Sequence, residues 1–531
     1  MSGRQGDRSY SPRVVVIGAG IGGLTASALL AHRGYSVLVL DQAIVPGGCA
    51  STFKRQGFTF DVGATQVAGL EPGGIHHRIF SELEIDLPTA THCDPACAVY
   101  LPGETQPISV WRDPQRWQAE RQRQFPGSEP FWQLLSDLFG YSWAFQARDP
   151  VLPPRNLWDL WQLTKAVRPD TLLTLPHMFS TVGNALRGYG LADDQRLRTF
   201  LDLQLKLYSQ VNAEETALLY AATALGVSQE PQGLFHLHGS MQALSDRLVA
   251  ALKRDGGKLL MRHTVEAIHT DRGKVTGVAI RNQKTDEVWT EPADHVVANV
   301  TVQNLMQLLG DQAPNSYQQR VEKLPPSSGA FVVYLGVDES AVPADCPPHL
   351  QFLYDYEGAI AENNSLFVSV SRPGDGRAPR GKATIIASSF TDVELWSGEW
   401  GVGNGEWGVE SQQQLKTQNS KLKTQNFYKA LKQRYTEGAI AHLSKFFNLT
   451  DETILHVEAA TPRTFSHFTG RDRGVVGGIG QRVPTFGPFG FANRTPIRNL
   501  WLVGDSTHPG EGTAGVSYSA LTAVRQIEAG W

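Results

Sequence analysis

The sequence lacks the features that would place the protein outside the cytosol or on nucleic acid. Its 531 residues include four cysteines, too few for the disulfide framework of a secreted domain. No apolar run approaches the roughly 18 residues that a membrane-spanning helix needs, and residues 1–12 lack the apolar core of a secretory signal. The formal net charge of −4 gives no attraction for nucleic acid. We therefore expect a protein of the cytosol or of a cytosol-facing membrane surface.

Signals for a metal site or a redox pair are equally weak. The spacing of Cys93 and Cys97 is one residue wider than that of the usual redox motif, and no second ligand pair accompanies them. This spacing favours plain thiols, and we expect no metal centre.

A glycine-rich turn near the N-terminus carries the first strong signal. Gly18, Gly20 and Gly23 follow the apolar run 14–17, and the order strand, turn, helix is typical of a dinucleotide-binding motif. Gly18 would allow a tight turn, Gly20 would let the backbone approach a pyrophosphate, and Gly23 would let the helix pack against the strand. The amino end of the helix would then face the phosphates.

An acidic residue follows at a spacing close to the one that this motif requires. Asp41 ends the apolar run 37–40 and lies 18 residues after Gly23. A carboxylate at this place can bind a pair of ribose hydroxyls. The same negative charge disfavours a 2′-phosphate, so we do not expect NADP.

A second glycine-rich segment lies near the C-terminus, where an apolar strand at 500–503 would end in Gly504 and Asp505. We expect Asp505 to bind the ribityl hydroxyls of a flavin and a helix to begin near Ala514. Amides at the amino end of that helix would lie beside the flavin ring and stabilise the anion that forms when the flavin accepts a hydride. Two such segments at opposite ends of the chain favour FAD over NAD.

The apolar periodicity predicts an α/β fold in which a Rossmann-like FAD-binding domain carries an inserted mixed α+β substrate domain. We assign 1–80, 231–300 and 456–531 to the FAD-binding domain and 81–230 and 301–455 to the substrate domain. The segment 81–230 is expected to be helical and membrane-facing, with helices at 131–139, 157–167, 197–207 and 214–225. A strand at 295–299 is expected to return into the main sheet.

One segment of the substrate domain is internally duplicated. The sequence Gly-Glu-Trp-Gly-Val at 398–402 recurs at 405–409, and Leu-Lys-Thr-Gln-Asn at 415–419 recurs at 422–426. Two copies cannot build a solenoid, and the composition is polar. We therefore interpret 392–426 as a dispensable surface insertion.

These motifs together resemble those of flavoproteins of the two-dinucleotide-binding-domain type, and more closely the carotenoid desaturase and carotene isomerase family. Two motifs are most similar to those of cyanobacterial carotenoid 3′,4′-desaturases. They are Gly-Gly-Cys-Ala-Ser-Thr-Phe at 47–53 and Gly-Asp-Ser-Thr-His-Pro-Gly at 504–510. The resemblance covers nearly the whole chain except the duplicated segment. It implies that FAD is held by Gly18, Gly20, Gly22, Gly23, Asp41, Gln42, Gly47, Gly48, Val265, Gly504, Asp505, Gly512, Thr513, Ala514, Gly515 and Val516.

The resemblance implies that two hydrogens leave adjacent carbons of a carotenoid polyene, one as a hydride to the flavin and one as a proton. His508 and Glu511 lie in the flavin-side loop and are the candidates for proton transfer; a turn residue and a loop-closing hydrogen bond are their alternative roles. Oxygen or a quinone would reoxidise the flavin, and no motif chooses between them.

A carotenoid substrate would have to be drawn from a bilayer, and one predicted helix suits that task. Trp158 and Trp161 lie on its wide apolar face, with Arg155, Lys165 and Arg168 as basic flanks, a pattern typical of the lipid–water interface. Packing of the same face into the domain core is the alternative.

Three other functions are compatible with the scaffold. A carotene cis–trans isomerase would use reduced FAD without net redox change, but His508 favours a desaturase, because isomerases of the family tend to have an aromatic residue there. An amine oxidase would commonly have a covalent-flavin cysteine, and no cysteine follows Cys346. A non-enzymatic Rab-escort type of protein would have decayed flavin motifs, whereas these are intact.

Overall fold

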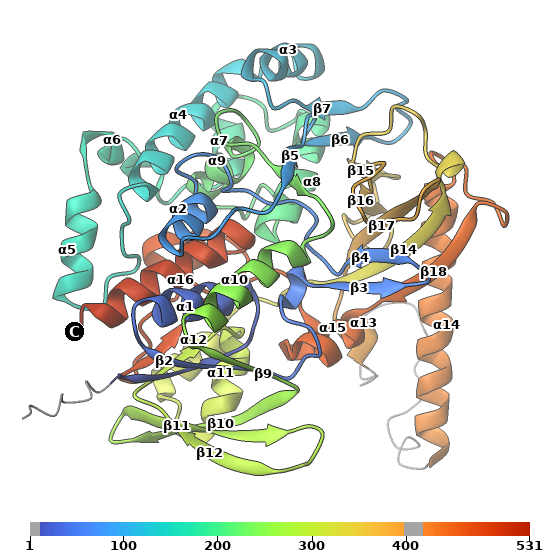
Figure 1. The fold of residues 1–531 in the computed structure, drawn as a ribbon. Coiled ribbons are helices and arrows are strands. Elements are labelled where there is room, and N and C mark those ends of the chain that lie inside the picture. Colours follow the sequence, from blue (N-terminus) through green and yellow to red (C-terminus); the bar gives the residue numbers. More distant parts are fainter. Residues whose placement is uncertain (1–10, 398–417, 531) are drawn as a thin grey trace, which may run out of the picture.

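The computed structural model describes residues 11–397 and 418–530 (Figure 1). Its central element is a parallel sheet with the strand order β19-β13-β1-β2-β9. The strands are β1 (Arg13–Ile17), β2 (Ser36–Asp41), β9 (Lys258–Met261), β13 (His295–Ala298) and β19 (Leu500–Leu502). The expected return strand is confirmed, since β13 pairs with β1 from Val14↔His295 to Ile17↔Ala298.

Both faces of this sheet are buried, and side chains along β1 alternate between them. Val14 and Val16 contact a layer of three helices, α1 (Ile21–His32), α10 (Gln242–Arg254) and α16 (Thr513–Glu528), which lie side by side in Figure 1. Val15 and Ile17 face the opposite layer. That layer contains β10 (His263–Asp271), β11 (Lys274–Asn282), β12 (Val288–Pro292), α11 (Val302–Leu309) and α12 (Asn315–Glu322). The α/β fold expected from the sequence is confirmed.

A second, mainly antiparallel sheet has the strand order β18-β14-β17-β16-β15-β6-β7. The strands are β6 (Cys97–Tyr100), β7 (Ile108–Val110), β14 (Gly329–Asp338), β15 (His349–Leu353), β16 (Ser365–Val370), β17 (Lys382–Thr391) and β18 (Ile454–Ala460). Helix α14 (Gln418–Leu443) covers one face. The hairpin β3 (Thr52–Arg55) and β4 (Phe58–Asp61) packs on the other.

A helical region shares a core with strands of the seven-stranded sheet. It contains α3 (Pro114–Gln124), α4 (Glu129–Gln146), α5 (Leu157–Ala166), α6 (Pro169–Leu172), α7 (Val182–Gly188), α8 (Gln195–Ser209) and α9 (Leu218–Gly226). The shorter elements α2 (Ile75–Glu82), β5 (Ala90–His92) and β8 (Phe235–Leu237) connect it to the nucleotide-binding part. Each helix expected between 131 and 225 is present. Three agree with the expected bounds within about four residues at either end, but α4 continues seven residues beyond the expected end at 139.

The structure draws the boundaries between the two parts differently from the sequence. Strands β6 and β7 belong to the seven-stranded sheet, although 81–230 was expected to be helical. Helices α11 and α12 pack on the five-stranded sheet rather than in the substrate part, and β18 lies in the seven-stranded sheet. Because these short segments take their places from long-range pairing, local periodicity does not reveal them.

The expected surface insertion begins inside the core. Residues 392–397 include Trp396, which is 1% exposed and lies in α13 (Glu394–Ser397). Its ring stacks on Phe331, with the centroids 5.5 Å apart, and its indole N–H donates to the Thr391 hydroxyl at 2.8 Å. The insertion therefore cannot start at 392, while residues 398–417, which hold most of the duplication, lie outside the described residues.

Candidate functional site

A cavity of about 900 Å³ opens at the carboxyl ends of β1, β13 and β19. Both glycine-rich segments line it, so the fold brings together the two halves of the predicted site. The lining includes Gly18, Gly20, Gly22, Asp41, Gln42, Gly47, Gly48, Val265, Gly504, Asp505, Glu511, Gly512, Thr513, Ala514, Gly515 and Val516. Gly23 and His508 lie behind this surface.

The glycine turn has the geometry that the motif predicts. Gly18 has φ +93°, a conformation that L side chains rarely adopt. A Cβ on Gly23 would lie 2.0 Å from the Gly18 carbonyl oxygen, so only glycine lets α1 start so close to β1. The amino end of α1 faces the cavity, which suits a pyrophosphate.

Asn299, at the carboxyl end of β13, links the two glycine segments. A Cβ on Gly20 would lie 2.9 Å from its Nδ2, and a Cβ on Gly22 or Gly504 would lie 2.7 or 2.9 Å from its Oδ1. The side chain also lines the cavity. From its sequence, Asn299 was expected only at the end of a strand and not in the site. Its position at the carboxyl edge of a parallel sheet is the signal that could have identified it.

Asp41 lines the cavity but already accepts two backbone hydrogen bonds. Its carboxylate takes the N–H of Ala19 at 2.6 Å and that of Ala43 at 2.7 Å. Burial raises the pKa of Asp41, and these two bonds partly offset the effect. A carboxylate can accept about four hydrogen bonds, so this one can fix the glycine turn and still bind ribose hydroxyls.

Two further backbone features give the nucleotide end its shape. Gly47 and Gly48 have φ +119° and +58°, and the Gly47 N–H donates to the Ala19 carbonyl at 2.8 Å, which ties the paired glycines to the turn. In β10, the pairing with β11 shifts between Val265 and Ala267. Such a bulge interrupts the ladder and re-aims the strand beside a site.

The C-terminal segment places the start of α16 against the cavity. Gly510 and Gly512 have φ +115° and +87°, and the first helical bond runs from the Val516 N–H to the Gly512 carbonyl. The N–H groups of residues 513–515 precede that bond and have no partner within the helix. They form the positively polarised end that the sequence predicted.

Three charged and two neutral side chains lie beside this helix start. We call Cys49, Gln210, Arg471, Asp505 and Glu511 the Arg471 cluster. Arg471 Nη1 lies 2.8 Å from Asp505 Oδ2. The Gln210 amide donates to Glu511 at 2.9 and 3.2 Å. Burial raises the pKa of Glu511 to about 8, and the Asp505 charge acts in the same direction. Arg471 and Gln210 were not predicted, because both come from loops.

His508 has a different environment from the one expected for a catalytic base. Its Nε2 lies 2.7 Å from Gln146 Nε2, and its ring lies between Phe486 and Tyr518. Burial lowers the pKa of His508 to about 4, so the imidazole is neutral near pH 7. Gln146, which lines the cavity, stands beside it.

The rest of the cavity is apolar and aromatic. The helical region contributes Tyr208 and Tyr220 to its lining, and the seven-stranded sheet contributes Phe367 and Phe390. Phe486 comes from the segment between α15 and β19. Burial raises the pKa of the Tyr220 hydroxyl well above its ordinary value, and this group donates to the Tyr208 carbonyl. The Tyr220 hydroxyl is therefore satisfied within the protein.

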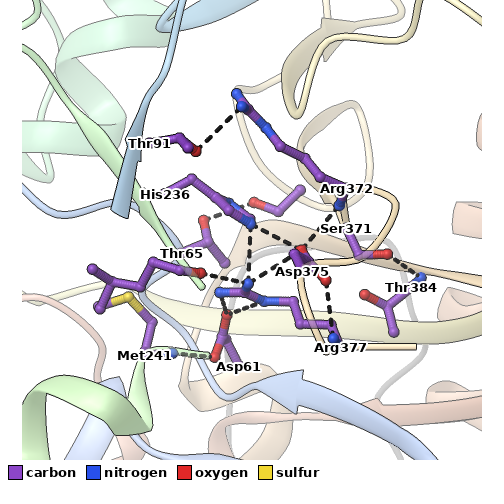
Figure 2. A network of polar contacts seen from close by, with 12 residues as sticks. Asp61, Thr65, Thr91, His236, Met241, Ser371, Arg372, Asp375, Arg377 and Thr384 are labelled. Carbon is purple, nitrogen blue, oxygen red and sulfur yellow. Dashed lines mark hydrogen bonds and ion pairs between the residues drawn. The ribbon is translucent and has the colours of Figure 1, made fainter. Parts of the chain in front are cut away.

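A second buried charge network lies behind the cavity wall; we call Asp61, His236, Asp375 and Arg377 the Arg377 cluster (Figure 2). Arg377 donates to Asp61 at 2.9 and 3.1 Å, to Asp375 at 3.2 Å and to the Leu237 carbonyl at 2.7 Å. Asp61 also accepts the Met241 N–H at the start of α10. The cluster thus ties β4, β8 and the loop after β16 together beneath residues 63–66 of the cavity wall.

Helix α5 turns its apolar side outward. Leu157 and Trp161 are 80% and 60% exposed, whereas Asp159 is fully buried. Arg494 and Gln526 bind the Asp159 carboxylate at 3.2 and 2.9 Å. Packing of the Leu157 and Trp161 side of α5 into the core is thereby excluded. Trp158, which was expected on the same exposed face, is partly buried. The apolar surface consists of Leu157, Leu160, Trp161, Leu172, Leu173, Leu175 and Phe179.

Within the residues that the structure describes, no helix has both the length and the apolar composition required to span a bilayer. The two cysteines Cys93 and Cys97 are free thiols. Burial raises their pKa to about 11 and about 12, which keeps both protonated near neutral pH.

Comparisons with known proteins identify a family of flavoproteins. The family of flavin containing amine oxidoreductases matches residues 21–398. Prolycopene isomerase 1 of an Oncidium hybrid cultivar is 26% identical, over 97% of this chain and 83% of the relative. The zeta-carotene-forming phytoene desaturase of Myxococcus xanthus is also 26% identical, over 97% and 93%. Cyclohexylamine oxidase from Brevibacterium oxydans shares the fold, with a TM-score of 0.59 at 17% identity over 98% of this chain and 100% of that one. The resemblance expected from the motifs is confirmed.

Proposed function

Since the chain belongs to the flavin containing amine oxidoreductase family, we propose that it is a carotenoid desaturase acting on the 3′,4′ bond. The protein is an FAD-dependent oxidoreductase. The observation that supports this substrate class is the composition of one cavity, in which a nucleotide cradle continues into an aromatic chamber. A long apolar polyene suits such a chamber, because each apolar group that leaves water contributes to binding.

The residues of the cavity fit FAD. A side chain at Gly20, Gly22 or Gly504 would overlap Asn299. Because glycine has no side chain, a diphosphate can approach the backbone amides there. Asp41 would bind the adenosine ribose, and Asp505 the ribityl chain. When bound, FAD supplies a flavin ring that accepts a hydride. The free N–H groups at the start of α16 would stabilise the negative charge that this acceptance creates.

Glu511 is the group that we assign to proton transfer. It lines the cavity, and a pKa of about 8 lies near the working pH, which is where acid–base catalysis is efficient. The ionised Oε2, oriented by the Gln210 amide at 2.9 Å, accepts the proton that a desaturation releases. His508 would act through Gln146 as a positioning residue, because it lies behind the cavity surface.

We also propose that the apolar surface around α5 attaches the enzyme to a lipid bilayer, from which it takes its substrate. Three exposed basic residues, Arg155, Lys165 and Arg168, flank the surface, and the Lys165 ammonium lies 5.8 Å above the Trp161 ring. Apolar side chains with a basic rim suit the boundary between acyl chains and anionic headgroups.

The product mass tests the reaction. The purified holoenzyme is incubated with liposomes that contain one carotenoid at a time. A desaturase lowers the mass of the carotenoid by two hydrogens and shifts its absorption to longer wavelength. Unchanged mass, formed only with prereduced FAD, would identify an isomerase. Peroxide released from amines, with no carotenoid product, would identify an amine oxidase, a function that the family also includes by name.

A further inference from the structure

The cavity contains little positive charge for a ligand that carries a diphosphate. Among the described residues that line it, the permanent cations are Arg78 and Arg471. Arg78 is paired with Asp149 at 2.7 Å. Asp41, Asp505 and Glu511 contribute acidic groups to the same lining. A nearby cation would strengthen the binding of a dianionic diphosphate in this setting beyond what the backbone amides of the glycine turn provide.

Arg471 is held in place by the loop that follows α15 (Pro462–Thr469). Its Nε donates to the Val475 carbonyl at 2.8 Å, and its Nη2 donates to the Gly477 carbonyl. Its Nη1 pairs with Asp505 at 2.8 Å. A guanidinium has five N–H groups, so these three contacts leave two of them for a ligand.

The position of Arg471 is beside the glycine turn. Its charge acts on the Cys49 thiol, and its guanidinium is paired with Asp505. These two residues follow directly after Gly48 and Gly504. A Cβ on Gly48 would lie 3.3 Å from the Gly20 Cα, and one on Gly504 would lie 2.9 Å from the Asn299 side chain, which also abuts Gly20. The glycine turn and the guanidinium therefore face the same part of the cavity.

We propose that Arg471 is a cofactor-binding residue whose two remaining N–H groups donate to the diphosphate of FAD. Asp505, its partner, keeps the guanidinium oriented and leaves one oxygen for the ribityl chain. This assignment concerns the cofactor alone and holds whichever substrate the enzyme uses.

The test compares ligands that contain the diphosphate with one that lacks it. Full-length protein stripped of flavin is titrated with FAD, ADP and riboflavin. Arg471→Gln should weaken FAD and ADP binding by about ten- to a hundredfold and leave riboflavin binding unchanged. Arg471→Lys, which keeps the charge but not the fork, should lose less of the FAD affinity. Arg473→Gln is the matched control, because this neighbour pairs with Glu394 and Asp472 instead.

Two results would overturn the assignment. The first is an Arg471→Gln or Arg471→Lys variant that loses riboflavin affinity as strongly as ADP affinity, since Arg471 would then shape the whole cavity. The second is full recovery of FAD affinity in the double variant Arg471→Gln/Asp505→Asn. That recovery would mean that Arg471 only neutralises Asp505. Under the proposal the double variant still binds FAD and ADP weakly. Circular dichroism of each variant establishes that it is folded.

Discussion

The Arg377 cluster is buried and its charges are paired with one another, whereas the Arg471 cluster lines the cavity and is partly exposed to it. In the Arg377 cluster, the arginine and both carboxylates are enclosed, with Arg377 3% exposed, and the two Asp375 oxygens take bonds from the backbone N–H groups of Arg372 and Arg377. Each cluster contains one buried side-chain atom without a partner, His236 Nδ1 and Gln210 Oε1. Among the described residues, however, only the Arg471 cluster contains a carboxyl group, that of Glu511, with no cation paired to it.

This difference separates a structural network from one that awaits a ligand. Buried charges that are fully paired hold segments together, and they are costly to break. Burial opposes ionisation of Asp375, but the bonds from His236 and the backbone outweigh it and hold the pKa of Asp375 below its usual value. For Glu511, burial prevails and the pKa rises to about 8. A strongly shifted acid in a cavity is typical of a functional site.

The largest expected effect comes from Glu511→Gln, which should lower the turnover of carotenoid by about 10²–10⁴-fold while FAD content stays constant. In the wild type, kcat/KM should rise as pH increases through about 8, because the ionised carboxylate is the base. Turnover assays over a pH series check both expectations. The control is Glu215→Gln, an exposed residue paired with Arg482. Unaltered turnover in Glu511→Gln would show that Glu511 does not accept the proton.

The same carboxyl group gives a stability test with a defined sign. Its folded-state pKa lies above its ordinary value of 4.5, so its contribution to stability is present below that value and is lost as pH rises through about 8. Thermal unfolding of the stripped protein should show this loss in the wild type, and Glu511→Gln should remove it.

Arg377→Met should reduce the free energy of unfolding by about 3–5 kcal/mol, because two carboxylates would be left buried without their cation. Urea denaturation measures the loss. The control Arg380→Met changes an exposed arginine three residues away and should stay within about 0.5 kcal/mol. An Arg377→Met variant that is as stable as the wild type but contains no flavin would show that the Arg377 cluster serves cofactor binding rather than stability.

Trp396→Ala tests the edge of the duplicated segment. Removal of a fully enclosed indole costs about 3–5 kcal/mol, and replacing the whole of 392–426 with a Gly/Ser linker should cost at least as much. Phe427→Ala, at a side chain that is 48% exposed, is the control by urea denaturation. Equal stability of the linker variant and the wild type would restore 392 as the start of a dispensable insertion.

Gly20→Val should leave the fold intact and remove the cofactor. The new Cβ would lie 2.9 Å from the Asn299 amide, an overlap worth about 1–3 kcal/mol, and the side chain would occupy the place where the diphosphate meets the backbone. Flavin content after gel filtration is the measurement. In the control Gly140→Val, the new Cβ has open space around it. FAD retained at the wild-type level would refute the placement of the diphosphate.

The smallest effect is expected at the apolar surface. Each large apolar side chain that inserts into lipid contributes about 1.5–3 kcal/mol, so Leu157→Ser and Trp161→Ser should release protein from liposomes without loss of FAD. Cosedimentation measures binding. Val288→Ser, at an exposed apolar residue of β12, is the control. Undiminished liposome binding of both α5 variants would assign membrane attachment to another surface.

Much of the nucleotide-binding part could be predicted from the sequence, because its signals are local. Glycine is needed at Gly18 and Gly23 by backbone geometry, and the acid after the second strand stands at a fixed distance along the chain. The loop at Gly504 and the return strand at 295–298 follow from the same kind of pattern.

Other features depend on residues far apart in the chain, and only the tertiary structure decides them. Asp159 is buried because Arg494 and Gln526 reach it from the C-terminal part, so periodicity alone could not tell which side of α5 faces outward. Burial raises the pKa of Glu511, and its neighbours Gln210 and Arg471 come from parts of the chain far from it in the sequence. The sequence by itself determined the fold and the cofactor, since local backbone geometry encodes both. Which carboxyl group has a raised pKa, and which face of α5 is exposed, both depend on burial. Burial is created by packing between residues that are far apart in the chain.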